Sequence, residues 1–309
     1  YSGEIRWCGM NRLEANLGRI RLKNPITVAS GTFGLDFANF YDLNRLGAIV
    51  SKTLTFKTKS GNPPPRLYET KAGLLNSIGL QNPGVKTFCK NDLMEYQEIF
   101  SPLFVSVSGS KIKEFIKTVK YLEKFNGIAG YEINVSCPNV KNEGIAFGTD
   151  EKIVAELIEK IRKTTKREII VKLTPNVTSI ERIAKAAEDN GADCLALINT
   201  LQGMAINWKT GKSFIKKGIA GYSGPAVKPV ALQNVYRVHQ TVEIPIIGMG
   251  GICNFQDAME FFYAGATAVA VGTFCFVEPK LPMMILDELK KYLEKDDKDL
   301  KDIIGEISF

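Results

Sequence analysis

Apolar positions along the chain follow two different periods. Short apolar runs bounded by glycine, proline or polar clusters predict β-strands, and longer segments with apolar residues three and four positions apart predict helices. The predicted strands cover residues 26–29, 48–51, 103–107, 131–136, 168–173, 194–198, 244–248 and 268–271. The predicted helices cover residues 37–46, 84–99, 111–125, 150–164, 180–190, 227–240 and 255–264, and further helical segments follow from Pro282.

The predicted strands and helices alternate along the chain, which is typical of an α/β protein. Eight such strands predict a (β/α)8 TIM barrel in a single domain over residues 1–309. Residues 15–22 predict an N-terminal hairpin. The long connections 54–83 and 201–224 predict loop insertions at strand ends, and the second is long enough for a hairpin over the barrel mouth. A doubly wound open sheet is the alternative, but no GxGxxG motif follows the first strand.

Composition narrows the class of protein further. Of the 309 residues 45% are apolar, enough for one large core or two modest ones, yet no apolar run approaches the ~20 residues of a membrane span. No secretion signal is visible, so we expect neither membrane attachment nor export. Six scattered cysteines without a CxxC motif disfavour a zinc or all-cysteine iron–sulfur site and suit the reducing cytoplasm. The net charge of +7 is mild and favours a solvated basic surface over a nucleic-acid-binding face.

The strand predicted at residues 131–136 runs into Cys137 and Pro138, and proline cannot continue a β-ladder. In parallel α/β proteins the loops after the strands carry the chemistry. Cys137 is therefore a candidate reactive group, with a buried structural cysteine as the alternative. The glycine-containing segment 141–149 that follows predicts a lid over Cys137, with an ordinary surface loop as the alternative.

Polar residues also end the other predicted strands. A lysine at such a position is costly unless it meets an anion or an electron-rich ring, although its ammonium can also reach solvent. Asparagines both donate and accept, which suits a ligand with an amide or imide edge. Besides Cys137, the residues at strand ends are Ser30, Lys52, Thr53, Ser106, Asn134, Lys172, Asn199 and Thr200.

Glycine-rich turns follow the last two predicted strands, at Gly250-Gly251 and Gly272-Thr273. Barrels commonly bind phosphate there, because glycine lets backbone N–H groups approach the phosphate oxygens. Tight packing of strand on helix is the alternative. The only histidine, His239, lies in a predicted helix, and no carboxylates gather at strand ends, which disfavours Cys-His nucleophiles, metal hydrolases and glycosidases. The pattern fits proton abstraction coupled to redox work by a phosphorylated cofactor.

Six segments of the chain resemble motifs of class 1 dihydroorotate dehydrogenases, and the resemblance extends over about residues 17–280. The segments are residues 29–31 (ASG), 76–83 (NSIGLQNP), 132–139 (EINVSCPN), 198–200 (INT), 223–226 (SGPA) and 248–252 (GMGGI). The resemblance implies a cytoplasmic barrel that binds flavin mononucleotide (FMN) and oxidises dihydroorotate to orotate in de novo pyrimidine biosynthesis. The stretch 198–206 is similar to the 1B branch. That likeness implies a homodimeric core and a partner subunit with an iron–sulfur cluster and FAD that passes electrons to NAD.

The resemblance also implies roles for individual residues. Cys137 would be the base that takes the proton from C5 of dihydroorotate while hydride leaves C6, and no metal is implied. The family usually has asparagine where this chain has Ser106, whose shorter side chain leaves room for a water. The flavin would be held by Ser30, Lys52, Thr53, Ser106, Asn134, Lys172, Ile198, Gly224, Gly250, Gly251, Gly272 and Thr273, and the substrate by Lys52, Asn76, Ser77, Ile78, Gly79, Leu80, Asn134, Asn199 and Thr200.

Four other functions remain as alternatives. Dihydropyrimidine dehydrogenases share a related flavin barrel within a much longer chain that has iron–sulfur motifs, and dihydrouridine synthases add a helical RNA-binding domain. A fumarate-linked 1A-like dihydroorotate dehydrogenase would need no partner subunit. A barrel that binds a phosphorylated ligand without catalysis is the non-enzymatic alternative.

Overall fold

The computed structural model describes residues 12–136 and 147–309, and its centre is a parallel β-barrel. The eight-stranded sheet has the order β3-β14-β13-β10-β9-β8-β7-β4. The ring closes between β3 and the start of β4, where the Gly47 N–H donates to the Ile26 carbonyl at 2.8 Å. The predicted barrel is therefore confirmed. Its strands are β3 (Ile26–Val28), β4 (Ile49–Val50), β7 (Leu103–Val107), β8 (Gly130–Asn134), β9 (Glu168–Lys172), β10 (Cys194–Leu197), β13 (Ile246–Gly248) and β14 (Ala268–Val271).

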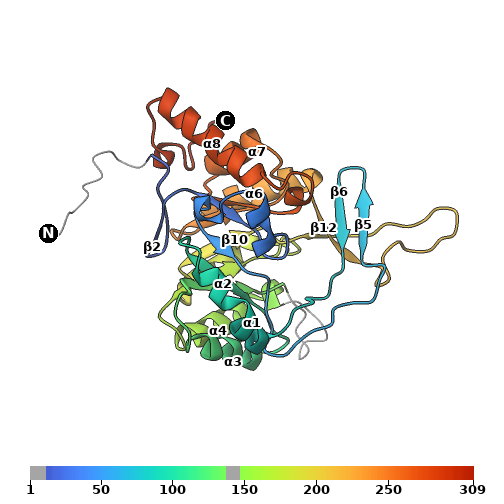
Figure 1. Cartoon of the computed structure of the whole chain (residues 1–309). Coiled ribbons are helices and arrows are strands. Elements are labelled where there is room, and N and C mark those ends of the chain that lie inside the picture. The colour runs from blue at the N-terminus through green and yellow to red at the C-terminus, as the bar shows by residue number, and fades with distance from the viewer. Residues whose placement is uncertain (1–11, 137–146) are drawn as a thin grey trace.

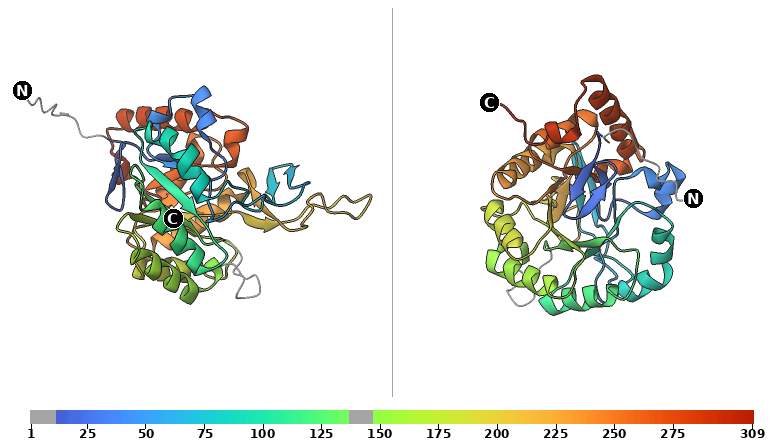
Figure 2. Two further views of the ribbon diagram at one scale, coloured as in Figure 1. Left: turned by 60° about the horizontal axis from the view of Figure 1, so that its bottom comes forward. Right: turned by 90° about the vertical axis from the view of Figure 1, so that its left-hand side faces the viewer.

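Helices surround the barrel strands, as the right-hand view of Figure 2 shows. Each amphipathic helix turns its apolar stripe inward; α3, for example, buries Phe115, Val119 and Leu122. None of the helices in the described ranges is long and apolar enough to cross a membrane. The α-helices are α1 (Val85–Asn91), α2 (Leu93–Gln97), α3 (Ile112–Leu122), α4 (Glu151–Arg162), α5 (Ile180–Asp189), α6 (Lys228–His239), α7 (Phe255–Tyr263) and α8 (Leu281–Lys295).

Two predicted helices differ from the structure. Residues 37–46 form only two short 3-10 turns, η1 (Leu35–Asn39) and η2 (Leu43–Arg45), because Asp42 is extended and uses its side chain to cap η2. The helix predicted at 84–99 is divided into α1 and α2 at Asp92. Aspartate is a poor residue for a helix interior because its carboxylate competes for backbone N–H groups, and the bond from Asn44 N–H to Asp42 explains the first interruption in this way.

The insertions form antiparallel structure outside the barrel. The predicted N-terminal hairpin is confirmed by β1 (Ala15–Leu17) and β2 (Ile20–Leu22). A second, four-stranded sheet has the order β11-β12-β6-β5 and projects from the barrel mouth (Figure 1), and we call it the projecting sheet. The strands of the projecting sheet are β5 (Leu67–Thr70), β6 (Gly73–Asn76), β11 (Leu201–Gly203) and β12 (Ala220–Ser223). The hairpin predicted within 201–224 is confirmed by β11 and β12, whereas the strands in connection 54–83 were not predicted.

The projecting sheet has a small apolar core of its own. Leu75, Ile215 and Ala220 are buried together, and the rings of Tyr68 and Phe214 stack with centroids 4.1 Å apart. Beta-strand pairs without an apolar face are marginally stable, so this core holds the sheet in place. The projecting sheet thus provides a fixed outer wall above the carboxyl ends of the barrel strands.

Candidate active site

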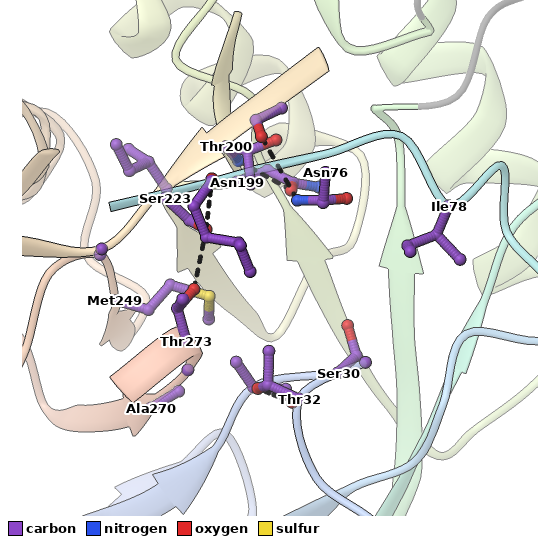
Figure 3. A pocket seen from close by; sticks show the side chains of 18 of the residues that line it. Ser30, Thr32, Asn76, Ile78, Asn199, Thr200, Ser223, Met249, Ala270 and Thr273 are labelled. Atoms are coloured by element: carbon purple, nitrogen blue, oxygen red, sulfur yellow. Dashed lines mark hydrogen bonds between the residues drawn. The ribbon is translucent and has the colours of Figure 1, made fainter. Parts of the chain in front are cut away.

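A cavity of about 710 Å³ lies between the carboxyl ends of the barrel strands and the projecting sheet. Figure 3 shows its walls, to which β-strands and loops from both halves of the chain contribute side chains. The volume is in the range of natural cofactor sites. Of the predicted site residues that the structure describes, all except Ser106 line it: Ser30, Lys52, Thr53, Asn76, Ser77, Ile78, Gly79, Leu80, Asn134, Lys172, Ile198, Asn199, Thr200, Gly224, Gly250, Gly251, Gly272 and Thr273.

One end of the cavity is a cradle of backbone N–H groups. Gly250 and Gly251 have φ angles of +126° and +80°, a conformation that side chains other than glycine rarely adopt. Within the described residues, nothing accepts a hydrogen bond from the N–H groups of Gly250, Gly251 or Gly272. Beside them, the Thr273 hydroxyl donates to Ser223 Oγ at 2.8 Å (Figure 3). Unused donors at the start of a helix fit a phosphate group.

Two lysines approach the middle of the cavity. Lys172 Nζ donates to Ser30 Oγ at 3.1 Å and lies 3.8 Å from Glu132 Oε2. The Lys52 ammonium makes no hydrogen bond or ion pair to any residue in the described ranges. Burial, followed by repulsion from Lys172 and Arg66, lowers the pKa of Lys52. Two neighbouring cations, one without a counter-ion, favour an anionic or electron-rich ligand.

Two neighbouring asparagines, Asn134 and Asn199, line the cavity together. Asn199 Nδ2 donates to Ser136 Oγ at 2.8 Å and to Asn134 Oδ1 at 3.3 Å, and the Thr200 N–H donates to Asn199 Oδ1 at 2.8 Å. These bonds fix both amide groups. The Nδ2 of Asn134 makes no hydrogen bond to any described residue and is free to donate to a ligand.

The segment from Asn76 to Leu80 forms the outer wall. Gly79 and Leu80 both have positive φ angles, +73° and +54°. Asn62 Nδ2 holds the segment by donating to the Ser77 carbonyl at 2.9 Å and to Ser77 Oγ at 3.1 Å. A non-glycine residue in the left-handed region is kept there only by its surroundings, and such strain is common at ligand sites.

Ser106 does not line the cavity; it is fully buried behind Thr53, to whose hydroxyl it is hydrogen-bonded at 2.9 Å. Cys137 and residues 141–146 of the predicted lid lie outside the described residues. At the end of that segment Phe147 is buried and its ring lies 5.5 Å from that of Phe115, and the lid itself stays a prediction.

Several cavity residues were not predicted from the sequence. Ser136 and Ser223 lie within the motifs quoted above, so the motifs could have identified them. Met249 and Phe274 add apolar wall, which suits the face of a flat ring; Met249 lies in the quoted motif 248–252, whereas Phe274 resembles ordinary core in sequence. The remaining unpredicted lining residues are Ala29, Gly31, Thr32, Leu67, Leu74, Gly221, Ile252, Cys253, Ala270 and Phe276.

Known proteins match almost the whole chain. The family model described as dihydroorotate dehydrogenase matches residues 12–293. A protein of Thermoanaerobacter pseudethanolicus named "Dihydroorotate dehydrogenase B (NAD(+)), catalytic subunit" is 48% identical over 298 residues, which cover 96% of this chain and 98% of that protein. Proteins with the same name from Bacteroides fragilis and Malacoplasma penetrans are 44% identical over 299 residues (96% and 99%) and 47% identical over 287 residues (92% and 94%). With the barrel, the anion cradle and the paired amides all inside this match, the chain belongs to the dihydroorotate dehydrogenase family.

Proposed function

We propose that this chain is the flavin-dependent enzyme that oxidises dihydroorotate to orotate in pyrimidine biosynthesis, with FMN as its flavin. The observation that carries the proposal is the single cavity in which an anion cradle, two lysines and two fixed asparagine amides meet. Near-full-length relatives named as dihydroorotate dehydrogenases favour this substrate over uracil, transfer RNA or a non-catalytic role. Orotate formation from dihydroorotate with a dye acceptor tests it.

The cavity fits a flavin with one phosphate. The N–H groups of Gly250, Gly251 and Gly272 would hold the phosphate, and Lys172 and Thr53 would lie against the ring system. When bound, the flavin supplies the redox chemistry that protein side chains lack, by accepting hydride from the substrate. A single cradle and a cavity of about 710 Å³ favour FMN over a dinucleotide.

The chain's own residues would bind and orient the substrate and move its proton. Asn134 and Asn199 present amide edges that match the ring of dihydroorotate, and Lys52 would neutralise its carboxylate. Cys137 would accept the proton from C5, since it follows the cavity residue Ser136 directly in the chain. The projecting sheet would exclude water from one side of the cavity.

We expect Lys172→Ala to lower the flavin reduction potential by about 30–60 mV. A charge-assisted contact of about 1.5–3 kcal/mol, converted for a two-electron couple, gives this size. The reason is that a fixed ammonium stabilises the negative charge that a reduced ring gains. Spectroelectrochemical titration measures the potential, with exposed Lys152→Ala as the matched control. An unchanged potential at full flavin occupancy would remove Lys172 from the ring site.

Orotate affinity should fall at alkaline pH. The pKa of Lys52 is lowered below 10.5 by burial and by its cationic neighbours, so its positive charge is lost as pH rises through that lowered pKa. Losing one partner of a buried charge pair costs about 2 kcal/mol or more, which is roughly 30-fold in Kd. Titrating the flavin absorbance with orotate from neutral to alkaline pH measures this. Lys52→Met should bind orotate weakly at every pH and show no further loss of affinity at alkaline pH. The exposed control Lys57→Met should bind orotate normally and keep the alkaline loss.

We further propose that an iron–sulfur and FAD-containing partner subunit receives the electrons and passes them to NAD. An apolar rim supports this: Phe276 lines the cavity yet is 60% exposed, and the next residue, Val277, is 72% exposed. The isolated chain should oxidise dihydroorotate with dyes but not with NAD. Steady-state assays of the purified chain measure both. Brisk reduction of NAD or fumarate by the chain alone would contradict the relay and favour a 1A-like enzyme.

The oligomeric state and compartment complete the proposal. We propose a homodimer, because the loop of the projecting sheet between β11 and β12 exposes Ile206, Ile219 and Trp208, the last at 84%. Sedimentation velocity of the chain and of Trp208→Ser tests this; a monomer for both would contradict it. A cytoplasmic location is supported by the unpaired thiols of Cys89, Cys194, Cys253 and Cys275.

A further inference from the structure

A chain of buried hydrogen bonds lies directly behind the cavity wall. Ser106 Oγ donates to Glu132 Oε1 at 2.8 Å, and the hydroxyls of Ser106 and Thr53 are 2.9 Å apart. The other carboxylate oxygen of Glu132 lies 3.8 Å from the Lys172 ammonium. Glu132, Ser106 and Thr53 are all almost completely buried, and only Thr53 lines the cavity. This series of hydrogen bonds therefore connects the buried Glu132 carboxyl group to one polar group on the cavity wall, the Thr53 hydroxyl.

The positions of the protons in this series of hydrogen bonds follow from the number of donors. In the contact between Ser106 and Glu132 the hydroxyl donates to the carboxyl oxygen, which uses the one hydroxyl proton of Ser106. The contact between Ser106 and Thr53 must then use the proton of Thr53. This direction leaves Thr53 Oγ1 with lone pairs only. No described residue donates to that oxygen by any other bond, so the lone pairs remain for a ligand.

From this geometry we infer that Thr53 offers the cavity a hydroxyl that can only accept, and that Ser106 and Glu132 are positioning residues that fix this direction. The ligand group that it selects is a ring N–H, as found on the imide of a flavin and on the ring of dihydroorotate. A ligand with a ring oxygen, an unprotonated ring nitrogen or an N-alkyl group at this place would meet unmatched lone pairs. The inference rests on the proposed function, since it names the ligand group read by the same cavity.

Ser106 acquires a role different from the one expected of it. The resemblance to dihydroorotate dehydrogenases implies a Ser106 against the flavin, with a water to replace the longer side chain of asparagine. In the structure Ser106 is fully buried and acts only through Thr53. A buried Ser106 with Glu132 as its acceptor controls which way the Thr53 proton points, and this requires no direct contact with the ligand.

The test compares ligands that differ only in one N–H. Apoprotein is titrated with FMN and with 3-methyl-FMN, followed by quenching of flavin fluorescence. FMN-loaded protein is titrated with orotate and with its 1-methyl and 3-methyl derivatives, followed by flavin absorbance. The titration with the two flavins reports a flavin N–H, and the titration with the three pyrimidines reports a pyrimidine N–H. The two possible sources of the ring N–H that Thr53 accepts from are thereby distinguished. Methyl groups add a steric cost in every variant, so the quantity compared is the change in preference between variants.

Thr53→Val and Ser106→Ala should each reduce the preference for the N–H ligand about five- to tenfold in one of the two titrations, the size of one net hydrogen bond. Thr53→Ser should keep the full preference because it retains the hydroxyl. Glu132→Gln should reduce it, since a carboxamide can donate to Ser106 and reverse the chain. In Ser106→Ala the Thr53 side chain remains, so what changes at the cavity wall is the direction of its proton. That variant keeps the inference testable even when Thr53→Val does not bind flavin.

An unchanged preference in Ser106→Ala overturns the positioning role, and an unchanged preference in a flavin-binding Thr53→Val overturns the whole inference. Failure of the proposed function gives a different result, because the unsubstituted chain would then bind no flavin or form no orotate from dihydroorotate. Flavin content and orotate formation are therefore measured first on the unsubstituted chain.

Discussion

Cys137→Ser should lose most of its dihydroorotate oxidation at neutral pH while it still binds FMN and orotate. A free thiol has a pKa of about 8.5, close enough to neutral pH to be deprotonated in a suitable site, whereas an alkyl hydroxyl does not ionise there. Removing a general base costs about 10²- to 10⁴-fold in rate. The residual activity should rise with pH. Stopped-flow reduction of the flavin by dihydroorotate measures the chemical step alone.

Cys253→Ser is the matched control for this variant. Cys253 lines the cavity, burial raises the pKa of its thiol to about 11, and its Sγ lies 3.3 Å from the Gly251 carbonyl. It stands beside the anion cradle and should leave the reductive rate nearly unchanged. Full activity of Cys137→Ser at neutral pH would remove Cys137 from proton transfer.

The second large effect is expected at the anion cradle. Gly251→Ala should weaken FMN binding by on the order of 100-fold or more, about 2.7 kcal/mol. An alanine Cβ there would lie 2.9 Å from the Lys228 backbone nitrogen and 3.0 Å from the Gly224 carbonyl oxygen, so the loop must move. The φ angle of +80° adds about 1–3 kcal/mol of strain. Fluorescence titration of the apoprotein with FMN measures the affinity.

Gly211→Ala separates loss of the cradle from backbone strain. Gly211 also has a positive φ angle, +66°, but a Cβ there meets nothing within 4 Å, and the residue lies on the outer loop of the projecting sheet. Its FMN affinity should equal that of the unsubstituted chain. Circular dichroism confirms that both variants keep the barrel. Equal FMN affinity for the two variants would show that the Gly250-Gly251 turn does not hold the phosphate.

The barrel strands could be predicted from the sequence because they are buried on both faces. Strand β14 is a continuous apolar run and β7 is interrupted only by Ser106, and the predicted bounds of both match the structure. Strands β5 and β6 were missed because β5 is short and half-exposed and follows three consecutive prolines. The pairing of β6 with β12 joins residues more than a hundred positions apart, such as Asn76 and Gly221, which local pattern does not show.

The site was predictable to a similar degree. Parallel strands bring their carboxyl ends to one rim, so Lys52, Asn134 and Lys172 could be assigned to one pocket before the fold was known. Ser106 shows the limit of that reasoning, because its position at a strand end does not reveal which face its side chain takes. The buried bond to Glu132 decides the matter, and it arises from the pairing of β7 with β8.

Orotate formation by the purified, FMN-loaded chain, supplied with dihydroorotate and a dye acceptor, tests the proposed function most directly. We expect stoichiometric appearance of orotate with reduction of the dye, bleaching of the flavin when the dye is omitted, and loss of most of both in Cys137→Ser at neutral pH. A chain that binds flavin but whose flavin is not bleached by dihydroorotate, or is bleached instead by a different reduced pyrimidine, would contradict it.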